Sequence, residues 1–207
     1  MIIDQSIPYR HIIMRLDPQN CTPREPRLPS GYSFHRYRDG DEREWAKIQH
    51  SVNEFPTVEM ALAYYRSWQK DRYGADRMAL AQHFVKSPSG ELIADTMLRQ
   101  KDIFTELRVT RLDWVACMPE HQGQGIATAL LRHILNEAVE SRPNDPIYLP
   151  TQPGSYAAVR MYWNLGFRVC RTSAIDDEEK PDAEAMEIIA PYYPDGFGET
   201  LVKTMVE

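Results

Sequence analysis

The segment Gln122–Ala127, with the sequence QGQGIA, decides the fold of this 207-residue chain. It follows a strand predicted over residues 107–118 and leads directly into a predicted helix. The first N–H groups of a helix have no partner within it, the helix dipole adds positive potential, and glycines let a ligand approach the backbone. The spacing is neither that of a P-loop nor that of the dinucleotide fingerprint GxGxxG. The residues therefore indicate an anion-binding loop, or else a tight turn between strand and helix.

A second motif lies in the segment Ser155–Phe167 (SYAAVRMYWNLGF), which predicts a helix that ends at Gly166. With both segments in this order, the sequence resembles the GCN5-related N-acetyltransferase (GNAT) superfamily. The family's acyl-CoA motif, Gln/Arg-x-x-Gly-x-Gly/Ala, is matched by Gln122–Ala127 at every fixed position. The family's second motif is matched at five positions: Ala158, Val159, Tyr162, Gly166 and Phe167. The resemblance extends more loosely over residues 31–171.

Apolar periodicity in the whole chain predicts an α/β fold, with a single mixed, mostly antiparallel sheet flanked by helices, and the resemblance implies the GNAT-like acyl-CoA N-acyltransferase fold. The expected strands cover residues 11–14, 32–37, 78–86, 92–99, 107–118, 147–149 and 201–206, with another beginning at Phe167. The expected helices cover residues 42–55, 58–68, 126–138 and 155–165. We expect residues 1–30 to form a peripheral N-terminal arm, with 11–14 as an edge strand, and residues 31–207 to form the acyltransferase domain.

Composition excludes several classes of protein. The net charge is −6, from 24 basic and 30 acidic residues, and no basic stripe suggests a nucleic-acid partner. No apolar run reaches the ~20 residues that span a bilayer, and the first ten residues lack a signal peptide's order, so we expect a cytoplasmic protein without a membrane partner. Three widely spaced cysteines and scattered histidines argue against disulfides and a metal site.

Residues 176–187 hold seven acidic residues and one lysine, and thus the whole net charge of the chain. One interpretation is a solvated surface loop. The other is a cover over the acceptor cleft that attracts cationic amines, because clustered like charge concentrates opposite charge.

The resemblance implies how an acyl-CoA donor is held. Its pyrophosphate would bind the backbone amides of the loop and of the first helical turn, which are those of Gly123, Gln124, Gly125, Ile126, Ala127 and Thr128, and Gln122 belongs to the same cofactor-binding site. Its pantetheine arm would pair like an extra strand with the backbone of Val115 and Cys117. Ser155 stands where the family often has Asn, which leaves that polar contact with the arm in doubt. We interpret Cys117 as a small apolar filler, because no histidine nearby in sequence could activate it.

The resemblance also makes Tyr162 the candidate general acid, which would protonate the departing thiolate; alternatively, it is a core residue of an amphipathic helix. Direct attack needs a neutral amine, so an ammonium must first lose a proton. Asp113 is the candidate base, since alternation along the strand predicts that it shares a side with Val115 and Cys117. Weaker alternatives are Glu106, His121 and a chain of waters.

The sequence therefore predicts an N-acetyltransferase that moves acetyl from acetyl-CoA to an amine by direct attack. The segment Glu54–Thr57 connects the first two helices, which form one acceptor wall in the family. Two alternatives are an acyl-CoA-binding sensor without turnover and a transferase of a larger acyl group. The acceptor's identity and the oligomeric state, monomer or homodimer, stay open.

Overall fold

Apolar strands build one seven-stranded mixed sheet in the computed structural model, which describes residues 2–21, 24–173, 175–176 and 179–207. The strand order is β2-β3-β4-β5-β6-β1-β7, and every neighbouring pair is antiparallel except β5 and β6. The strands are β1 (Ile12–Leu16), β2 (Ser33–Arg36), β3 (Gln82–Lys86), β4 (Leu92–Arg99), β5 (Thr110–Cys117), β6 (Ile147–Thr151) and β7 (Arg168–Val169). This confirms the predicted fold class.

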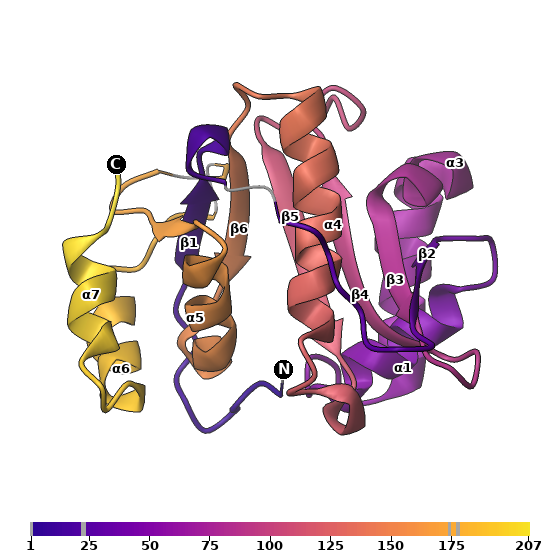
Figure 1. Cartoon of the computed structure of the whole chain (residues 1–207), viewed down its shortest axis with the longest axis horizontal. Helices are drawn as coiled ribbons and strands as arrows, with labels where there is room; N and C mark the ends of the chain where they lie inside the picture. Colours follow the sequence, from indigo (N-terminus) through magenta and orange to yellow (C-terminus); the bar gives the residue numbers. More distant parts are fainter. Residues whose placement is uncertain (1, 22–23, 174, 177–178) are drawn as a thin grey trace.

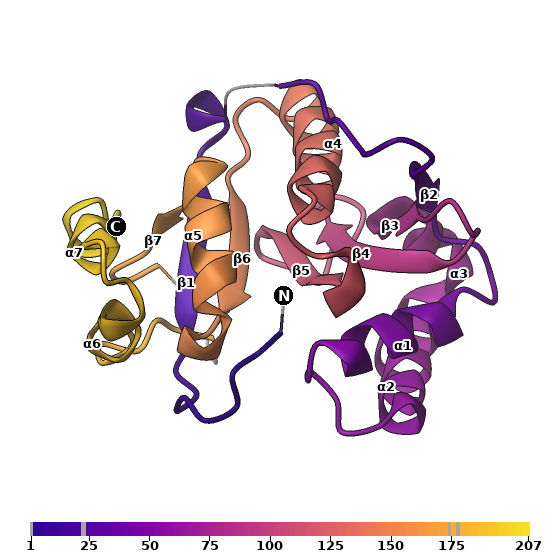
Figure 2. The ribbon, with the colours of Figure 1, turned by 60° about the horizontal axis from the view of Figure 1, so that its bottom comes forward.

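Helices cover both faces of the sheet (Figures 1 and 2). They are α1 (Glu42–Ser51), α2 (Val58–Tyr64), α3 (Asp71–Ala81), α4 (Ile126–Ser141), α5 (Tyr156–Asn164), α6 (Ala185–Ile189) and α7 (Phe197–Lys203). Short 3-10 turns cover Pro18–Asn20, Pro119–His121, Pro153–Ser155 and Ala190–Tyr192, and a π-helical turn, Tyr65–Lys70, joins α2 to α3. Helices α4 and α5 share one apolar core with β1 and β6, whereas α1, α2 and α3 pack with β3 and β4 on the opposite face.

Strands β5 and β6 separate soon after they begin. Their parallel pairing covers only Thr110 with Ile147 and Arg111 with Tyr148, although β5 continues to Cys117. Beyond Arg111, the β6-facing edge of β5 therefore has no strand partner. From that point β5 and β6, and with them the two halves of the sheet, diverge (Figure 2).

A bulge in β5 changes which way its side chains point. Trp114 has φ 58°, in the left-handed region that non-glycine residues seldom adopt, and the register against β4 shifts there. Asp113 therefore lies on the α1–α3 face, opposite Met97, whereas Val115 and Cys117 pack on the α4–α5 face. The expected alternation is thus wrong, because the bulged residue resets it.

Two side chains stabilise this bulge by binding its carbonyl groups. Thr96 Oγ1 donates to the Asp113 carbonyl at 3.1 Å, and Gln49 Nε2 donates to the Trp114 carbonyl at 3.2 Å. Gln49 also donates to the buried carboxylate of Asp95 at 2.9 Å. Buried backbone groups that leave the ladder need such partners, so these contacts hold the irregular strand in place.

Three strand predictions are wrong. The strand expected at the sheet edge, β1, lies between β6 and β7, because its apolar residues are buried on both faces. Residues 78–81 end α3 rather than starting β3. In place of the strand expected over residues 201–206, residues 201–203 end helix α7, in which Phe197 and Leu201 pack inward, and Val206 bridges to Cys170. The domain boundary after residue 30 stays a prediction.

Candidate active site

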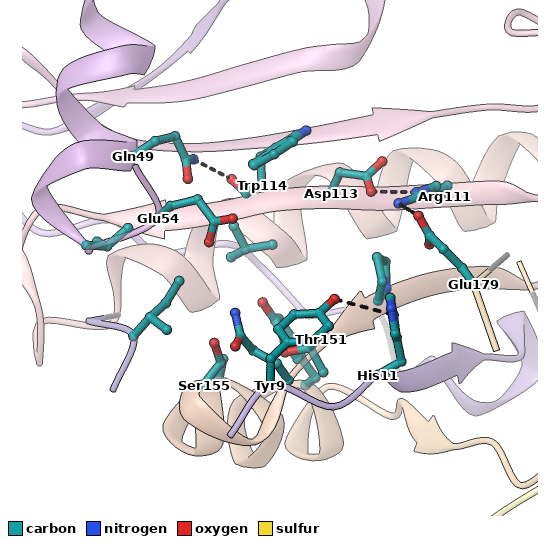
Figure 3. Close-up of a pocket in the computed structure, with 17 residues that line it drawn as sticks. Tyr9, His11, Gln49, Glu54, Arg111, Asp113, Trp114, Thr151, Ser155 and Glu179 are labelled. Carbon is teal, nitrogen blue, oxygen red and sulfur yellow. Dashed lines mark hydrogen bonds and ion pairs between the residues drawn. The ribbon is translucent and has the colours of Figure 1, made fainter. Parts of the chain in front are cut away.

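A pocket of about 230 Å³ lies where β5 and β6 diverge (Figure 3). Its walls come from β5, β6, the end of α1, the start of α5 and the N-terminal segment. Four of the residues selected from the sequence line it: Asp113, Val115, Ser155 and Tyr162. The divergence of two strands thus brings together residues from three distant parts of the chain.

The glycine loop lies at the end of β5 and leads into α4. Gly123 and Gly125 have φ of 75° and 78°, and Gly125 is the N-cap of this 16-residue helix. A Cβ added to either glycine would meet no atom within 4 Å, so the space above the loop is open. Gln122 Nε2 donates to the Cys117 carbonyl at 2.7 Å and ties the loop to the strand. This geometry leaves room for an anion at the first-turn amides, so anion binding by the loop stays a prediction.

Tyr162 comes from α5, lines the pocket and is 5% exposed. Burial, and then the negative charge of Glu54, raise the pKa of its phenol. The phenol therefore keeps its proton at neutral pH. Ser155, the N-cap residue of α5, lies seven residues before Tyr162 and does not cap the helix with its side chain.

Asp113 is held between two guanidinium groups. Its Oδ2 accepts from Arg99 Nη2 at 2.7 Å, and its Oδ1 accepts from Arg111 Nε at 2.6 Å. Burial acts to raise the pKa of the carboxyl, but the two arginines outweigh it and lower this pKa. Since both oxygens are engaged and the proton affinity is reduced, the geometry weighs against the predicted role as base.

We expect Asp113→Asn to destabilise the fold strongly. The variant leaves Arg99 and Arg111 buried without their carboxylate, and breaking a buried pair in this way costs about 3–5 kcal/mol. The pKa of Asp113 is lowered in the folded protein. Its carboxylate therefore contributes fully to the free energy of unfolding above the usual Asp pKa, and this contribution is lost as the pH falls through the lowered pKa of the folded state. Urea unfolding measures both effects. The exposed pair Arg160–Asp195 provides the control Asp195→Asn, which we expect to be nearly neutral, and equal losses would contradict this account.

The N-terminal segment lines one side of the pocket, a position that no sequence pattern indicates. The Ile3 N–H donates to the Val52 carbonyl at 2.9 Å, and the Asp4 N–H donates to the Gly154 carbonyl at 3.0 Å. Tyr9 and His11 follow along the pocket wall (Figure 3). This segment therefore connects the two halves of the sheet across the pocket.

Gly154→Ala should loosen this connection. A Cβ at Gly154 would lie 2.7 Å from the Asp4 carbonyl oxygen, which is backbone and must move. Losing one hydrogen bond of about 0.5–1.5 kcal/mol should increase the fraction of molecules in which the N-terminal segment is detached by about two- to tenfold. Hydrogen exchange of residues 3–7 should accelerate to that extent, with acyl-CoA affinity unchanged. An unaltered exchange rate would show that the contact between Asp4 and Gly154 does not hold the N-terminal segment in place.

Residues 176–187 also reach the pocket. Glu179 lines it and accepts from Arg111 Nη2 at 2.9 Å, and Asp182 Oδ2 accepts from the His11 N–H at 2.7 Å. Asp177 and Glu178 lie outside the described residues. Part of the acidic segment is therefore structural, and one of its carboxylates, that of Glu179, lines the pocket.

The remaining candidates lie apart from the pocket. Glu106 is 3.6 Å from Arg77, and His121 Nδ1 is 2.9 Å from the Tyr32 hydroxyl; neither lines the pocket. Cys117 is buried, and burial raises the pKa of its thiol to about 11, which suits a filler. Within the described ranges, no three His, Cys, Asp or Glu side chains gather to hold a metal ion. None of the described helices is both long and apolar enough to cross a membrane.

Comparisons with known proteins agree with this geometry. The model of the acetyltransferase (GNAT) family matches residues 34–167, which is more than half of the chain. The chain belongs to the GNAT family. This match contains both motifs and confirms the resemblance that they indicated. No curated protein matches the chain.

Solved GNAT structures share its fold. A GCN5-related N-acetyltransferase from Sphaerobacter thermophilus has a TM-score of 0.56 at 21% identity, over 78% of this chain and 49% of that one. The glucosamine N-acetyltransferase region of a fungal multi-domain β-N-acetylglucosaminidase has a TM-score of 0.56 at 15% identity, over 81% and 20%. A tandem GNAT protein of clavulanic acid biosynthesis has a TM-score of 0.54 at 16% identity, over 80% and 51%. The chain thus spans about half or less of these proteins' lengths.

Proposed function

We propose that the chain transfers acetyl from acetyl-CoA to an amine by direct attack. The observation that carries this proposal is the position of Tyr162 in the pocket between the unpaired edge of β5 and β6. A proton donor beside a free strand edge, with an anion-binding loop at the end of that strand, suits a thioester that lies along β5.

In this proposal the backbone of the chain binds the donor. The amides of the loop and the first turn of α4, from Gly123 to Thr128, bind the pyrophosphate, and Gln122 holds the loop against β5. The backbone of Val115 and Cys117 pairs with the pantetheine arm, and Ser155 adds a polar contact. A β5 amide at the bulge polarises the thioester carbonyl.

Tyr162 then completes the transfer. The amine nitrogen bonds to the thioester carbon, the carbon–sulfur bond breaks, and the phenol donates its proton to the sulfur. Asp113 acts here as the group that orders Arg99 and Arg111 beneath the bulge. The pocket holds the amine and the thioester side by side, so their reaction becomes a step within one complex instead of a bimolecular collision.

A free-CoA release assay over a panel of amines tests the proposal. We expect release to depend on an amine and to be faster with acetyl-CoA than with longer acyl-CoA donors. Tight binding of acetyl-CoA without transfer to any amine would instead favour the sensor. Preference for a longer chain would favour the transferase of a larger acyl group.

A further inference from the structure

We propose that Glu54 binds the acceptor amine as its ammonium form and removes the proton that blocks attack. This role rests on the proposed transfer to an amine. It assigns the base, for which the sequence favoured Asp113, to a different wall of the pocket.

Among the described residues that line the pocket, three carry a carboxylate: Glu54, Asp113 and Glu179. Asp113 is paired with two arginines, and Glu179 is paired with Arg111. No ion pair or side-chain hydrogen bond within the described ranges engages the carboxylate of Glu54. A base must be free to accept a proton, so this comparison selects Glu54.

The backbone fixes where Glu54 stands. Asn53, the residue before it, has φ 67°, a conformation that asparagine tolerates better than most side chains. The Glu54 N–H donates to the Gln49 carbonyl at 3.1 Å and closes the end of α1. His50 Nδ1 lies 2.9 Å from the Phe55 carbonyl, so contacts on both sides of Glu54 hold the connection. The carboxylate therefore projects from a defined turn toward the pocket (Figure 3).

The pocket lining brings Glu54 together with Tyr162 and Tyr9. The charge of Glu54 adds to the raised pKa of Tyr162, on the opposite wall, and to that of Tyr9, on the N-terminal segment. Neighbouring protein atoms desolvate the Glu54 carboxyl and raise its pKa, although the residue as a whole is exposed to solvent. A carboxylate with increased proton affinity and access to water can take a proton from an ammonium and release it to solvent.

The protons balance as follows. The ammonium gives one proton to Glu54, and the neutral amine forms the carbon–nitrogen bond as the thiolate leaves. Tyr162 protonates the sulfur, and the second proton lost by the nitrogen restores its phenol. Glu54 passes its proton to water, so each turnover releases one amide, one CoA thiol and one proton.

The pH profile reports this role. Activity should rise with pH through the raised pKa of Glu54, because only the carboxylate is active. The other titratable groups around it are Tyr9 and His11 of the N-terminal segment, His50 of α1, Tyr64 of α2, Arg111 and Asp113 of β5, Tyr162 of α5, and Glu179. Tyrosines and arginines titrate well above neutrality and Asp113 well below it. Variants of His11, His50 and Glu179 therefore test whether the acidic limb of the pH profile belongs to one of these residues or to Glu54.

The test compares Glu54→Gln with Glu59→Gln, which changes an exposed carboxylate on α2 outside the pocket. With an alkylamine, Glu54→Gln should lower kcat/KM by ~100- to 10,000-fold and remove the acidic limb of the profile. Glu59→Gln should match the wild type, and the limb should survive in His11→Asn, His50→Asn and Glu179→Gln. Acetyl-CoA affinity and melting temperature should be unchanged in Glu54→Gln.

An aromatic amine, neutral at pH 7, provides a second readout. It has no ammonium proton to lose, so Glu54→Gln should slow its acetylation far less than that of an alkylamine. Equal losses for both amines, or an unchanged acidic limb, would overturn this role of Glu54 while leaving the transferase function intact. No transfer by the wild type to either amine would overturn both.

Discussion

Replacing Gly125 with Asp is expected to abolish acetyl-CoA binding while the protein stays folded. Gly125 is the exposed N-cap of α4, and the space above it is open. The new carboxylate would stand where the proposed pyrophosphate binds and would repel it. Because φ is 78°, a side chain also strains the backbone by about 1–2 kcal/mol, which a folded domain of this size tolerates.

Gly125→Asn is the matched control for this variant. Asparagine has nearly the same size as aspartate and adopts left-handed backbone readily, but it carries no charge. Calorimetry should therefore detect binding to Gly125→Asn, although weaker than wild type, and none to Gly125→Asp. Circular dichroism should give the same folded signal for both. Wild-type affinity in Gly125→Asp would mean that the loop is only a turn.

The glycine loop and the helix after it could be predicted from the sequence because their physics is local. Gly123 and Gly125 are needed where the backbone turns left-handed, and the helix signal begins at the next residue. Tyr162 lies in α5, which follows this loop after α4 and β6, so its position in the motif order is also visible in the sequence. The mixed sheet and the glycine loop before α4 are therefore predictable from residues that are neighbours in the sequence.

The acceptor side could not be predicted in the same way, because its contacts join distant parts of the chain. The direction of Asp113 depends on the bulge at Trp114, which side chains of α1 and β4 stabilise. Tyr9 enters the pocket because residues 3 and 4 bind the loop after α1 and the turn before α5. Glu54 appeared in the sequence only as part of a connecting segment. Within the described part of the chain, Asp113 and Glu179 are paired with arginines whereas the carboxylate of Glu54 is not, and this difference depends on the fold.

The general-acid role of Tyr162 predicts a large and selective loss of turnover in Tyr162→Phe. The substitution keeps the ring, and with it the packing of α5 against Phe167, while deleting the hydroxyl. The departing thiolate resembles that of a free thiol with a pKa of ~8.5, so it can leave unprotonated and a general acid is helpful but not indispensable. General acid catalysis contributes ~100- to 10,000-fold, and we expect kcat to fall within that range.

Acetyl-CoA affinity and thermal stability separate this role from a structural one, and both should be nearly unchanged in Tyr162→Phe. Tyr156→Phe, on the same helix but outside the pocket, is the matched control and should keep wild-type turnover. The wild-type phenol stays protonated because burial raises its pKa, so Tyr162 should add no alkaline limb to the pH profile near neutrality. A stability loss as large as the loss of activity would identify Tyr162 as a core residue. Full activity in the Phe variant would contradict the acid role, and a water or another hydroxyl would then have to protonate the sulfur.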